Sequence, residues 1–175
     1  MMKSEYALRF PIGEFDNPEE FDPGEVEAWI HEIARSPERL RAAVSGLNAR
    51  QWDTPYRPGG WTARQVVHHL ADSHMNSFIR FKLALTEREP VIKPYDEAAW
   101  AQLPDTANAD PELSLALLDA LHARWSLLLR GLTTEEWHRS FVHPERGLVR
   151  LYENTAMYAW HGNHHLAHIG LIKST

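Results

Sequence analysis

Apolar residues recur every three or four positions in four long stretches of the chain, the spacing that gathers them on one face of a helix. We expect these helices over residues 23–47, 62–87, 110–131 and 152–173. The stripe is plainest in the third helix, where it comprises Leu115, Leu118, Leu121, Trp125, Leu128 and Leu129. Few segments show the strict alternation that is typical of a strand. The pattern therefore predicts an all-α fold, most simply a four-helix bundle.

Two groups of residues have the composition of a helix start. Asp110, Pro111 and Glu112 supply an N-cap, a first-turn proline and a favourable acid at the beginning of the third helix. The same residue types, Ser-Pro-Glu, occupy positions 36–38 in the middle of the first helical stretch. We therefore expect the first helix to be kinked or broken near Ser36.

The segments outside the long helices differ in character. Residues 88–108 contain three prolines and cannot form one regular helix, although 97–102 could form a short one. We interpret this stretch as a long crossover between the second and third helices. Residues 133–137 predict one extra helical turn, and 143–151 a small turn or hairpin before the last helix. Residues 1–24, rich in Pro, Gly, Phe and acids, predict an extended N-terminal arm.

Size and composition narrow the class of protein. We expect residues 1–175 to form one helical domain that includes the arm. The net charge of −6 and the absence of a basic run argue against a nucleic-acid or anionic-membrane partner. No apolar run approaches the roughly 20 residues of a membrane span and no secretory signal is apparent, so we expect a cytoplasmic protein. Without cysteine, a metal site has to use imidazole, carboxylate and water.

Histidines are concentrated near the C-terminus. Four of the eleven lie in a segment of eight residues: His161, His164, His165 and His168. On a helix these side chains all project within about 100° of one another. Residues four apart are neighbours, so His161 and His165 can place two imidazole nitrogens on one Zn²⁺-like ion. Solvated histidines, or core histidines satisfied by hydrogen bonds, are the alternative explanation.

A catalytic zinc commonly takes three protein ligands and leaves one position to water or substrate. The second helix offers His69, which lies within about 40° of a polar stripe. The members of that stripe are Thr62, Gln65, Ser73, Asn76 and Arg80. Either a solvated face or the polar wall of a pocket has this composition, and Trp61 at the helix start favours the pocket. His68 lies about 100° round the helix from His69, and His74 about 140°.

These segments resemble a known family. The resemblance is carried by Gly60-Trp61-Thr62, by Val66-Val67-His68-His69-Leu70-Ala71-Asp72 and by His161-Gly162-Asn163-His164-His165. Over about residues 10–170 the sequence is similar to the DinB-like superfamily, and most of all to its YfiT-type metal-dependent hydrolases. The resemblance implies a four-helix bundle that holds one divalent ion per chain, Zn²⁺ first and Ni²⁺ as the alternative. It implies His69, His161 and His165 as ligands, and the doubled histidines leave His68 and His164 as alternatives.

Three neutral imidazoles leave the full charge on the ion, which lowers the pKa of bound water towards about 7 and polarises a carbonyl group. We therefore expect a metal-dependent hydrolase that acts on a small molecule. The resemblance also supports a thiol-dependent S-transferase that uses bacillithiol or a similar small thiol, because DinB-like relatives include such transferases. A non-catalytic metal-binding bundle is the third hypothesis. The motifs of zinc proteases, serine hydrolases and P-loop enzymes are absent.

Supporting groups are less well defined by the pattern, and no general base can be named. Metal-bound imidazoles usually donate their other N–H to a carboxylate, carbonyl or water, and the candidates by type and position are Gln65, Asp72, Asn76 and Glu153. His164 and His168 could act as a proton shuttle, a substrate contact or scaffolding.

Because the ligands have to be neutral, we expect activity to fall below about pH 6. A homodimer is compatible with this many aromatic residues.

Overall fold

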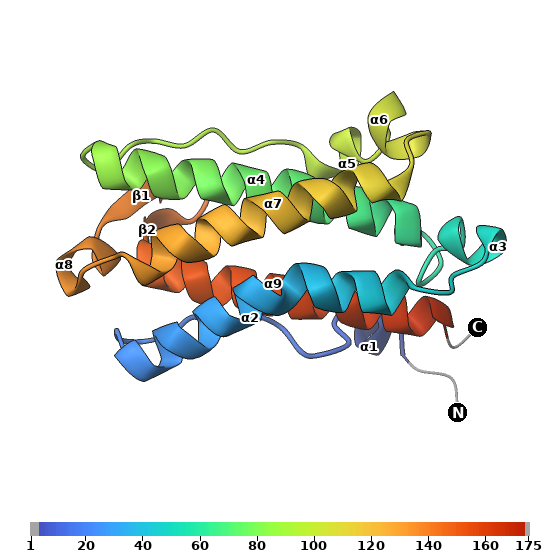
Figure 1. The fold of residues 1–175 in the computed structure, drawn as a ribbon, viewed down its shortest axis with the longest axis horizontal. Coiled ribbons are helices and arrows are strands. Elements are labelled where there is room, and N and C mark those ends of the chain that lie inside the picture. The colour runs from blue at the N-terminus through green and yellow to red at the C-terminus, as the bar shows by residue number, and fades with distance from the viewer. Residues whose placement is uncertain (1–3, 174–175) are drawn as a thin grey trace.

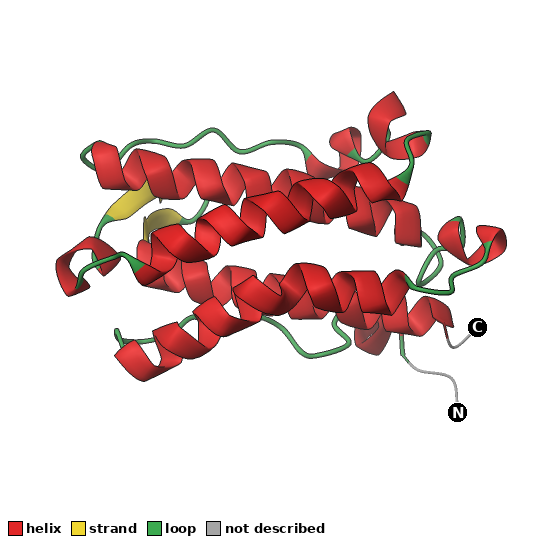
Figure 2. Ribbon diagram, viewed as in Figure 1, coloured by secondary structure: helices red, strands yellow, loops and turns green. Residues whose placement is uncertain are grey.

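Four long helices form the body of the protein (Figures 1 and 2). The computed structural model describes residues 4–173, and its long helices are α2 (Pro23–Val44), α4 (Ala63–Thr86), α7 (Pro111–Arg130) and α9 (Leu151–Lys173). Side-chain caps begin three of them: Asp22, Thr62 and Asp110 each accept a hydrogen bond from a first-turn N–H. The predicted four-helix bundle is confirmed.

The order of the long helices along the chain makes some neighbouring helices parallel and others antiparallel. The colour gradient shows α4 and α7 running in one direction and α2 and α9 in the other (Figure 1). Because the 24 residues of α4 span about 36 Å, a parallel α7 requires a connection of that length. The predicted crossover supplies it and carries α5 (Glu97–Trp100) and α6 (Pro104–Ala107). The first half of α4 consequently lies beside the second half of α9.

The expected break in the first helix is wrong, because α2 is continuous through Pro37. Proline has no N–H, so the carbonyl of Ile33, four residues earlier, lacks its usual helical partner. Nδ1 of His122 on α7 lies 2.6 Å from that oxygen. A donor from another helix therefore replaces the missing hydrogen bond and lets α2 continue.

A short helix and a hairpin connect α7 to α9. The extra turn is α8 (Thr134–Trp137), and the hairpin pairs β1 (Ser140–His143) with β2 (Gly147–Arg150) in antiparallel register. Phe141 lies opposite Val149, and both are buried. The predicted extra turn and hairpin are confirmed.

The N-terminal segment is not extended throughout. Within the described part, residues 4–22, it contains the helix α1 (Glu5–Arg9). Beyond α1 it is anchored by aromatic contacts, among them Phe15 on Trp160 of α9, with ring centroids 5.9 Å apart. A further short helix that the apolar pattern did not predict, α3 (Ala49–Trp52), precedes α4 and begins with a capping box.

The interior of the bundle contains two apolar clusters. The first is built around Phe81, Trp125 and Phe141, in the half that holds the end of α4 and the start of α9. The second, around Leu40, Leu70 and Ile169, lies in the opposite half. Buried histidines of α4, α7 and α9 occupy the positions between them: His69, His74, His122, His165 and His168. We call these residues, with the partly buried His161, the histidine layer.

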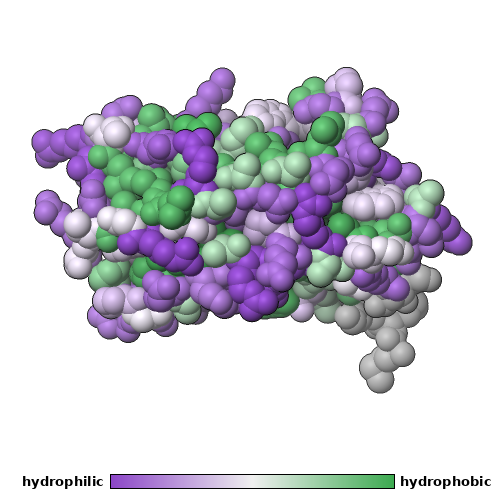
Figure 3. Space-filling view, viewed as in Figure 1, coloured by the Kyte–Doolittle hydropathy of each residue, from purple (hydrophilic) through white to green (hydrophobic). Residues whose placement is uncertain are grey.

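Hydrophobic and hydrophilic residues are interspersed on the surface, across the face seen in Figure 3. Exposed leucines on α7 contribute to this mixture: Leu113, Leu117 and Leu127. Among residues 4–173, none of the helices combines the length and the apolar character that a membrane span requires.

Candidate metal centre

Three histidines from two helices converge where α4 passes α9. Nε2 of His69 lies 3.2 Å from Nε2 of His161, and His165 is one helical turn beyond His161. One nitrogen from each of the three rings lies within 4.8 Å of the others. The structure thus brings together the three residues expected from the sequence. No second group of this kind occurs among the residues that the structure describes.

The arrangement fits a divalent ion. Zinc bonded tetrahedrally at about 2.0–2.1 Å holds its ligand nitrogens about 3.3 Å apart. The separation between Nε2 of His69 and Nε2 of His161 is close to this value, and one nitrogen of His165 lies within 4.8 Å of theirs. Imidazole nitrogens suit zinc and nickel alike, so the donor set leaves both metals open.

Burial keeps the three imidazoles neutral. It lowers the pKa of His69 to about 3, and the pKa values of His161 and His165 lie well below the ordinary 6.5. Neutral imidazole is the form that binds a metal. Since these rings resist protonation below pH 6, the expected loss of activity near pH 6 moves to a lower pH.

Neither alternative ligand joins the group. Nδ1 of His68 lies 2.7 Å from Oγ of Ser114 on α7, on a different side of α4. The ring of His164 stacks on Trp160, with centroids 4.4 Å apart. The geometry therefore favours His69 over His68, and His165 over His164.

Two cavities adjoin the three histidines. The first, of about 370 Å³, is lined by the three rings and by Trp61, whose ring centroid is 4.5 Å from that of His69. The second, of about 410 Å³, is lined in part by His161. Glu97 of the crossover lines both. A metal held here would face space that a small molecule can enter.

The supporting partners expected from the sequence are wrong, because their side chains are engaged elsewhere or do not reach the ligands. Gln65 closes the capping box of α4 and donates to the carbonyl of Ala101. Asn76 donates to the carbonyl of Asp72 in its own helix, and Glu153 accepts from the N–H of Arg150. Among the described residues, none of the four expected groups, Asp72 included, makes a hydrogen bond to the three ligands.

Three residues near the ligands were missed. Glu97 reaches the cavities because of the path of the crossover, which local sequence does not determine. His74 and His122 connect to His161 through hydrogen bonds. A signal for His122 existed: it sits among the core-facing positions of the third helix, where an unpaired polar ring is costly.

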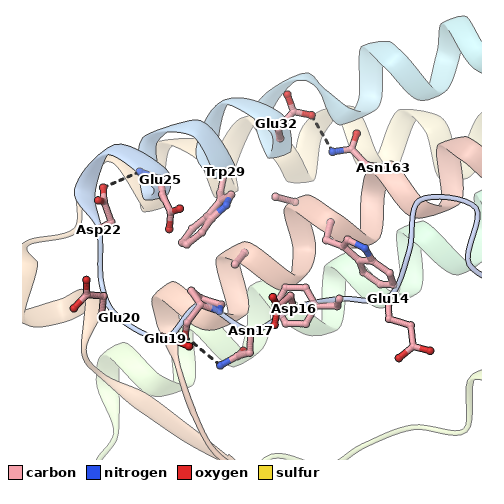
Figure 4. Close-up of a pocket in the computed structure, with 15 residues that line it drawn as sticks. Glu14, Asp16, Asn17, Glu19, Glu20, Asp22, Glu25, Trp29, Glu32 and Asn163 are labelled. Carbon is pink, nitrogen blue, oxygen red and sulfur yellow. Dashed lines mark hydrogen bonds between the residues drawn. The ribbon is translucent and has the colours of Figure 1, made fainter.

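A cavity larger than these two lies away from the histidine layer. It has a volume of about 780 Å³ and lies between the N-terminal segment, α2 and α9. Carboxylates dominate its lining, as Figure 4 shows: Glu14, Asp16, Glu19, Glu20, Asp22, Glu25 and Glu32. Nothing there converges on one point as the three imidazoles do, so chemistry rather than size identifies the candidate site.

Comparisons with known proteins identify the family of the chain. Residues 32–169 match the DinB superfamily. A protein of Bacillus licheniformis, named as a candidate metal-dependent hydrolase, is 52% identical over 163 residues, which cover 93% of each chain. A similarly named protein of Oceanobacillus iheyensis is 54% identical over 161 residues, covering 92% of this chain and 93% of that one.

Solved structures show the same fold. The structure of YfiT from Bacillus subtilis, described as a probable metal-dependent hydrolase with an unusual four-helix bundle topology, matches with a TM-score of 0.93 at 50% identity. The match covers 96% of this chain and 97% of YfiT. A mycothiol-dependent maleylpyruvate isomerase is similar in fold, with a TM-score of 0.66 at 17% identity. That match covers 83% of this chain and 60% of the isomerase.

Proposed function

The chain belongs to the DinB superfamily, and from that premise we propose that it is a metal-dependent hydrolase of a small molecule. Its ligands would be His69, His161 and His165. The observation that carries the proposal is the convergence of three neutral imidazoles beside two cavities. Three ligands leave a zinc-like ion one position for water or substrate, whereas a structural zinc is closed by four protein ligands.

A bound divalent ion would supply Lewis-acid activation of the nucleophile and of the bond to be cleaved. The rings of His69, His161 and His165 would hold it through neutral nitrogens. We propose Zn²⁺ as the first candidate and Ni²⁺ as the second, because both accept imidazole.

Glu97 is the proposed proton acceptor. Glu97 lines both cavities, so it borders the space beside the ligands. Water reaches this side chain, yet the surrounding protein desolvates the carboxyl and raises its pKa, an effect that Arg80 opposes. A carboxylate with a raised pKa is a stronger base towards the nucleophile, and a larger fraction of it is protonated near neutral pH and so able to donate to the leaving group.

Arg80 supports an anionic group on the substrate. It lines the second cavity with Glu97 and His161 and is partly buried. Its guanidinium makes no hydrogen bond or ion pair with any residue between 4 and 173. A carboxylate or phosphate of the substrate would supply the planar, paired acceptors that a guanidinium binds best.

A thiol is the alternative nucleophile, since the same open position would bind a thiolate. The chain has no cysteine, so the sulfur would come from a small molecule. The hydrolase proposal and this alternative use the same three ligands and differ only in what attacks.

A paired assay of protein loaded with Zn²⁺ or with Ni²⁺ tests the proposal. One reaction contains an activated ester carrying a carboxylate, and the other contains a small thiol and an electrophile. We expect metal-dependent ester hydrolysis that needs no thiol and is absent from His69→Ala. Turnover only with thiol would establish the transferase instead. Full metal occupancy without turnover in either reaction would establish a non-catalytic bundle.

A further inference from the structure

We propose that two chains of buried histidines, each ending on a main-chain carbonyl, fix the tautomers of His161 and His165 so that Nε2 of both faces the metal. The inference rests on the proposed function in one respect, namely that these residues are the ligands. It assigns His74, His122 and His168 as positioning residues.

The first chain runs from α9 through α4 and α7 to α2. Nδ1 of His161 lies 3.1 Å from Nε2 of His74. Nδ1 of His74 lies 2.8 Å from Nε2 of His122, and Nδ1 of His122 lies 2.6 Å from the carbonyl oxygen of Ile33. His74 and His122 are each 1% exposed, so water cannot substitute for any of these partners.

The carbonyl decides the direction of every hydrogen bond in this chain. A carbonyl only accepts, so Nδ1 of His122 carries the proton and its Nε2 accepts from His74. A neutral imidazole has one N–H, so His74 donates through Nδ1 and accepts through Nε2. His161 then donates through Nδ1, and its Nε2 keeps the lone pair. That Nε2 atom is the one that faces His69.

Pro37 leaves free the carbonyl on which this chain of histidines ends. A residue with an N–H at position 37 would bond the carbonyl of Ile33 within α2. Proline leaves that oxygen to His122. The proline inside α2 is thereby linked, through His122 and His74, to the orientation of the proposed metal ligand His161.

The second chain serves His165 in the same way. Nε2 of His168 lies 3.1 Å from the carbonyl oxygen of Arg9, so this nitrogen donates. Nδ1 of His168 therefore accepts, and Nδ1 of His165 lies 3.3 Å from it. The lone pair of His165 is left on Nε2. His168 is held by stacking on Tyr56, with ring centroids 3.8 Å apart and planes inclined by 13°.

The two chains orient the ligands before the ion arrives. Groups that hydrogen-bond to metal-ligating histidines fix the ring and its tautomer, and their loss typically weakens metal binding about 10- to 100-fold. Both chains end on carbonyls, which cannot pass a proton on. They therefore hold protons in place and do not conduct them to solvent. His69 differs, since its Nδ1 makes no hydrogen bond to another described residue.

Nitrogen-15 NMR of histidine side chains tests the inference without any variant. In metal-free and zinc-loaded protein alike, we expect the proton on Nδ1 in His74 and His122 and on Nε2 in His168. In zinc-loaded protein, His161 and His165 should carry it on Nδ1. A proton on Nε2 of His74, or on Nδ1 of His168, would overturn the inference even where zinc binds fully. If zinc fails to bind but the tautomers of His74, His122 and His168 are as expected, the proposed function is wrong and the hydrogen-bond directions in the two histidine chains are confirmed.

Zinc affinity, measured by competition with a chromophoric chelator, tests the consequence. We expect His122→Leu to weaken zinc about 10- to 100-fold, because His74 loses its acceptor. His122→Gln keeps an acceptor near the position of Nε2 and should recover most of the affinity. The matched control is His68→Leu, also a buried histidine with one side-chain partner, which should change affinity less than about threefold.

The second chain gives an independent variant if His122→Leu does not fold. His168→Leu should weaken zinc binding to a similar extent, and His168→Asn, which keeps an acceptor near Nδ1, should bind more tightly than His168→Leu. Wild-type affinity in folded His122→Leu or His168→Leu would overturn the inference. Equal losses in the leucine variants and in their amide counterparts would also do so, because packing alone would then explain the effect.

Discussion

The apolar clusters at the two ends of the bundle and the histidine layer between them both lie in the interior, but they are stabilised in different ways. An apolar cluster around Leu70 is stabilised by removal of hydrocarbon surface from water, a contribution that needs no partner of defined geometry. Buried imidazoles lose hydration, which has to be replaced by specific hydrogen bonds. The layer supplies them from one histidine to the next and ends on carbonyls.

The difference teaches where stability and function reside in this fold. Residues 69 and 70 are neighbours on α4, yet the first faces the proposed ion and the second faces the core. Replacing either removes a buried side chain. Only the replacement of His69 should abolish metal binding and activity. The following predictions test this separation of function from stability.

The largest expected effect is the loss of the ion from His69→Ala. With one of three ligands removed, zinc affinity should fall by more than about 100-fold, beyond the loss typical of supporting groups. Elemental analysis after dialysis measures it, with His68→Ala as the matched control that keeps a full equivalent. Retention of a full equivalent by His69→Ala would transfer the ligand role to another residue.

Glu97→Gln should lower kcat about 100- to 10,000-fold, the usual contribution of a proton-transferring group. Zinc content should not change, because the carboxylate is not among the three ligands. Glu145→Gln is the control, since Glu145 lines only the second cavity. A wild-type kcat in Glu97→Gln would remove the proposed proton acceptor.

Leu70→Ala should have the opposite profile to His69→Ala. It creates a cavity in an apolar cluster and should reduce the free energy of unfolding by about 2–5 kcal/mol. Urea denaturation of the metal-free protein measures this loss. The folded variant should still bind one equivalent of zinc, and a variant that remains folded but binds none would show that core and layer are not separable.

The histidine layer should make the stability of the metal-free protein depend on pH. Histidines of the unfolded chain take up protons near pH 6.5, whereas burial lowers the pKa of His122 and His168 to about 4 and that of His69 to about 3. Their contribution is complete above pH 6.5. As the pH falls from there towards 4, only the unfolded state gains protons, and each histidine costs up to about 1.4 kcal/mol per pH unit.

Urea denaturation at successive pH values measures this dependence. Leu70→Ala should lower the whole curve without changing its slope, because a leucine does not titrate. A free energy of unfolding that stays constant between about pH 7 and 5 would contradict the account of the layer.

Arg80→Met should have the smallest effect, an increase in KM of about tenfold for a substrate that carries a carboxylate, because one charge-assisted contact is lost. An uncharged ester of similar size should be affected less. Steady-state kinetics with the two substrates measure the difference, and equal changes in KM would remove the anionic group from the proposed substrate.

Local pattern predicted the helices well, since apolar spacing and caps such as Asp110 act within a few residues. It wrongly allowed a break in the first helix, because the donor that compensates Pro37 belongs to α7. The pair His161 and His165 could be found from helical spacing alone. The role of His69 needed the resemblance, and the position of Glu97 needed the path of the crossover. The supporting roles of His74 and His122 were missed because hydrogen-bond partners from four helices meet only in the folded bundle.

X-ray absorption at the zinc edge of protein loaded with one equivalent tests the central claim most directly. The account predicts three imidazole nitrogens and at least one oxygen from solvent at about 2.0–2.1 Å. A shell of four imidazole nitrogens, or one of oxygen atoms only, would contradict it.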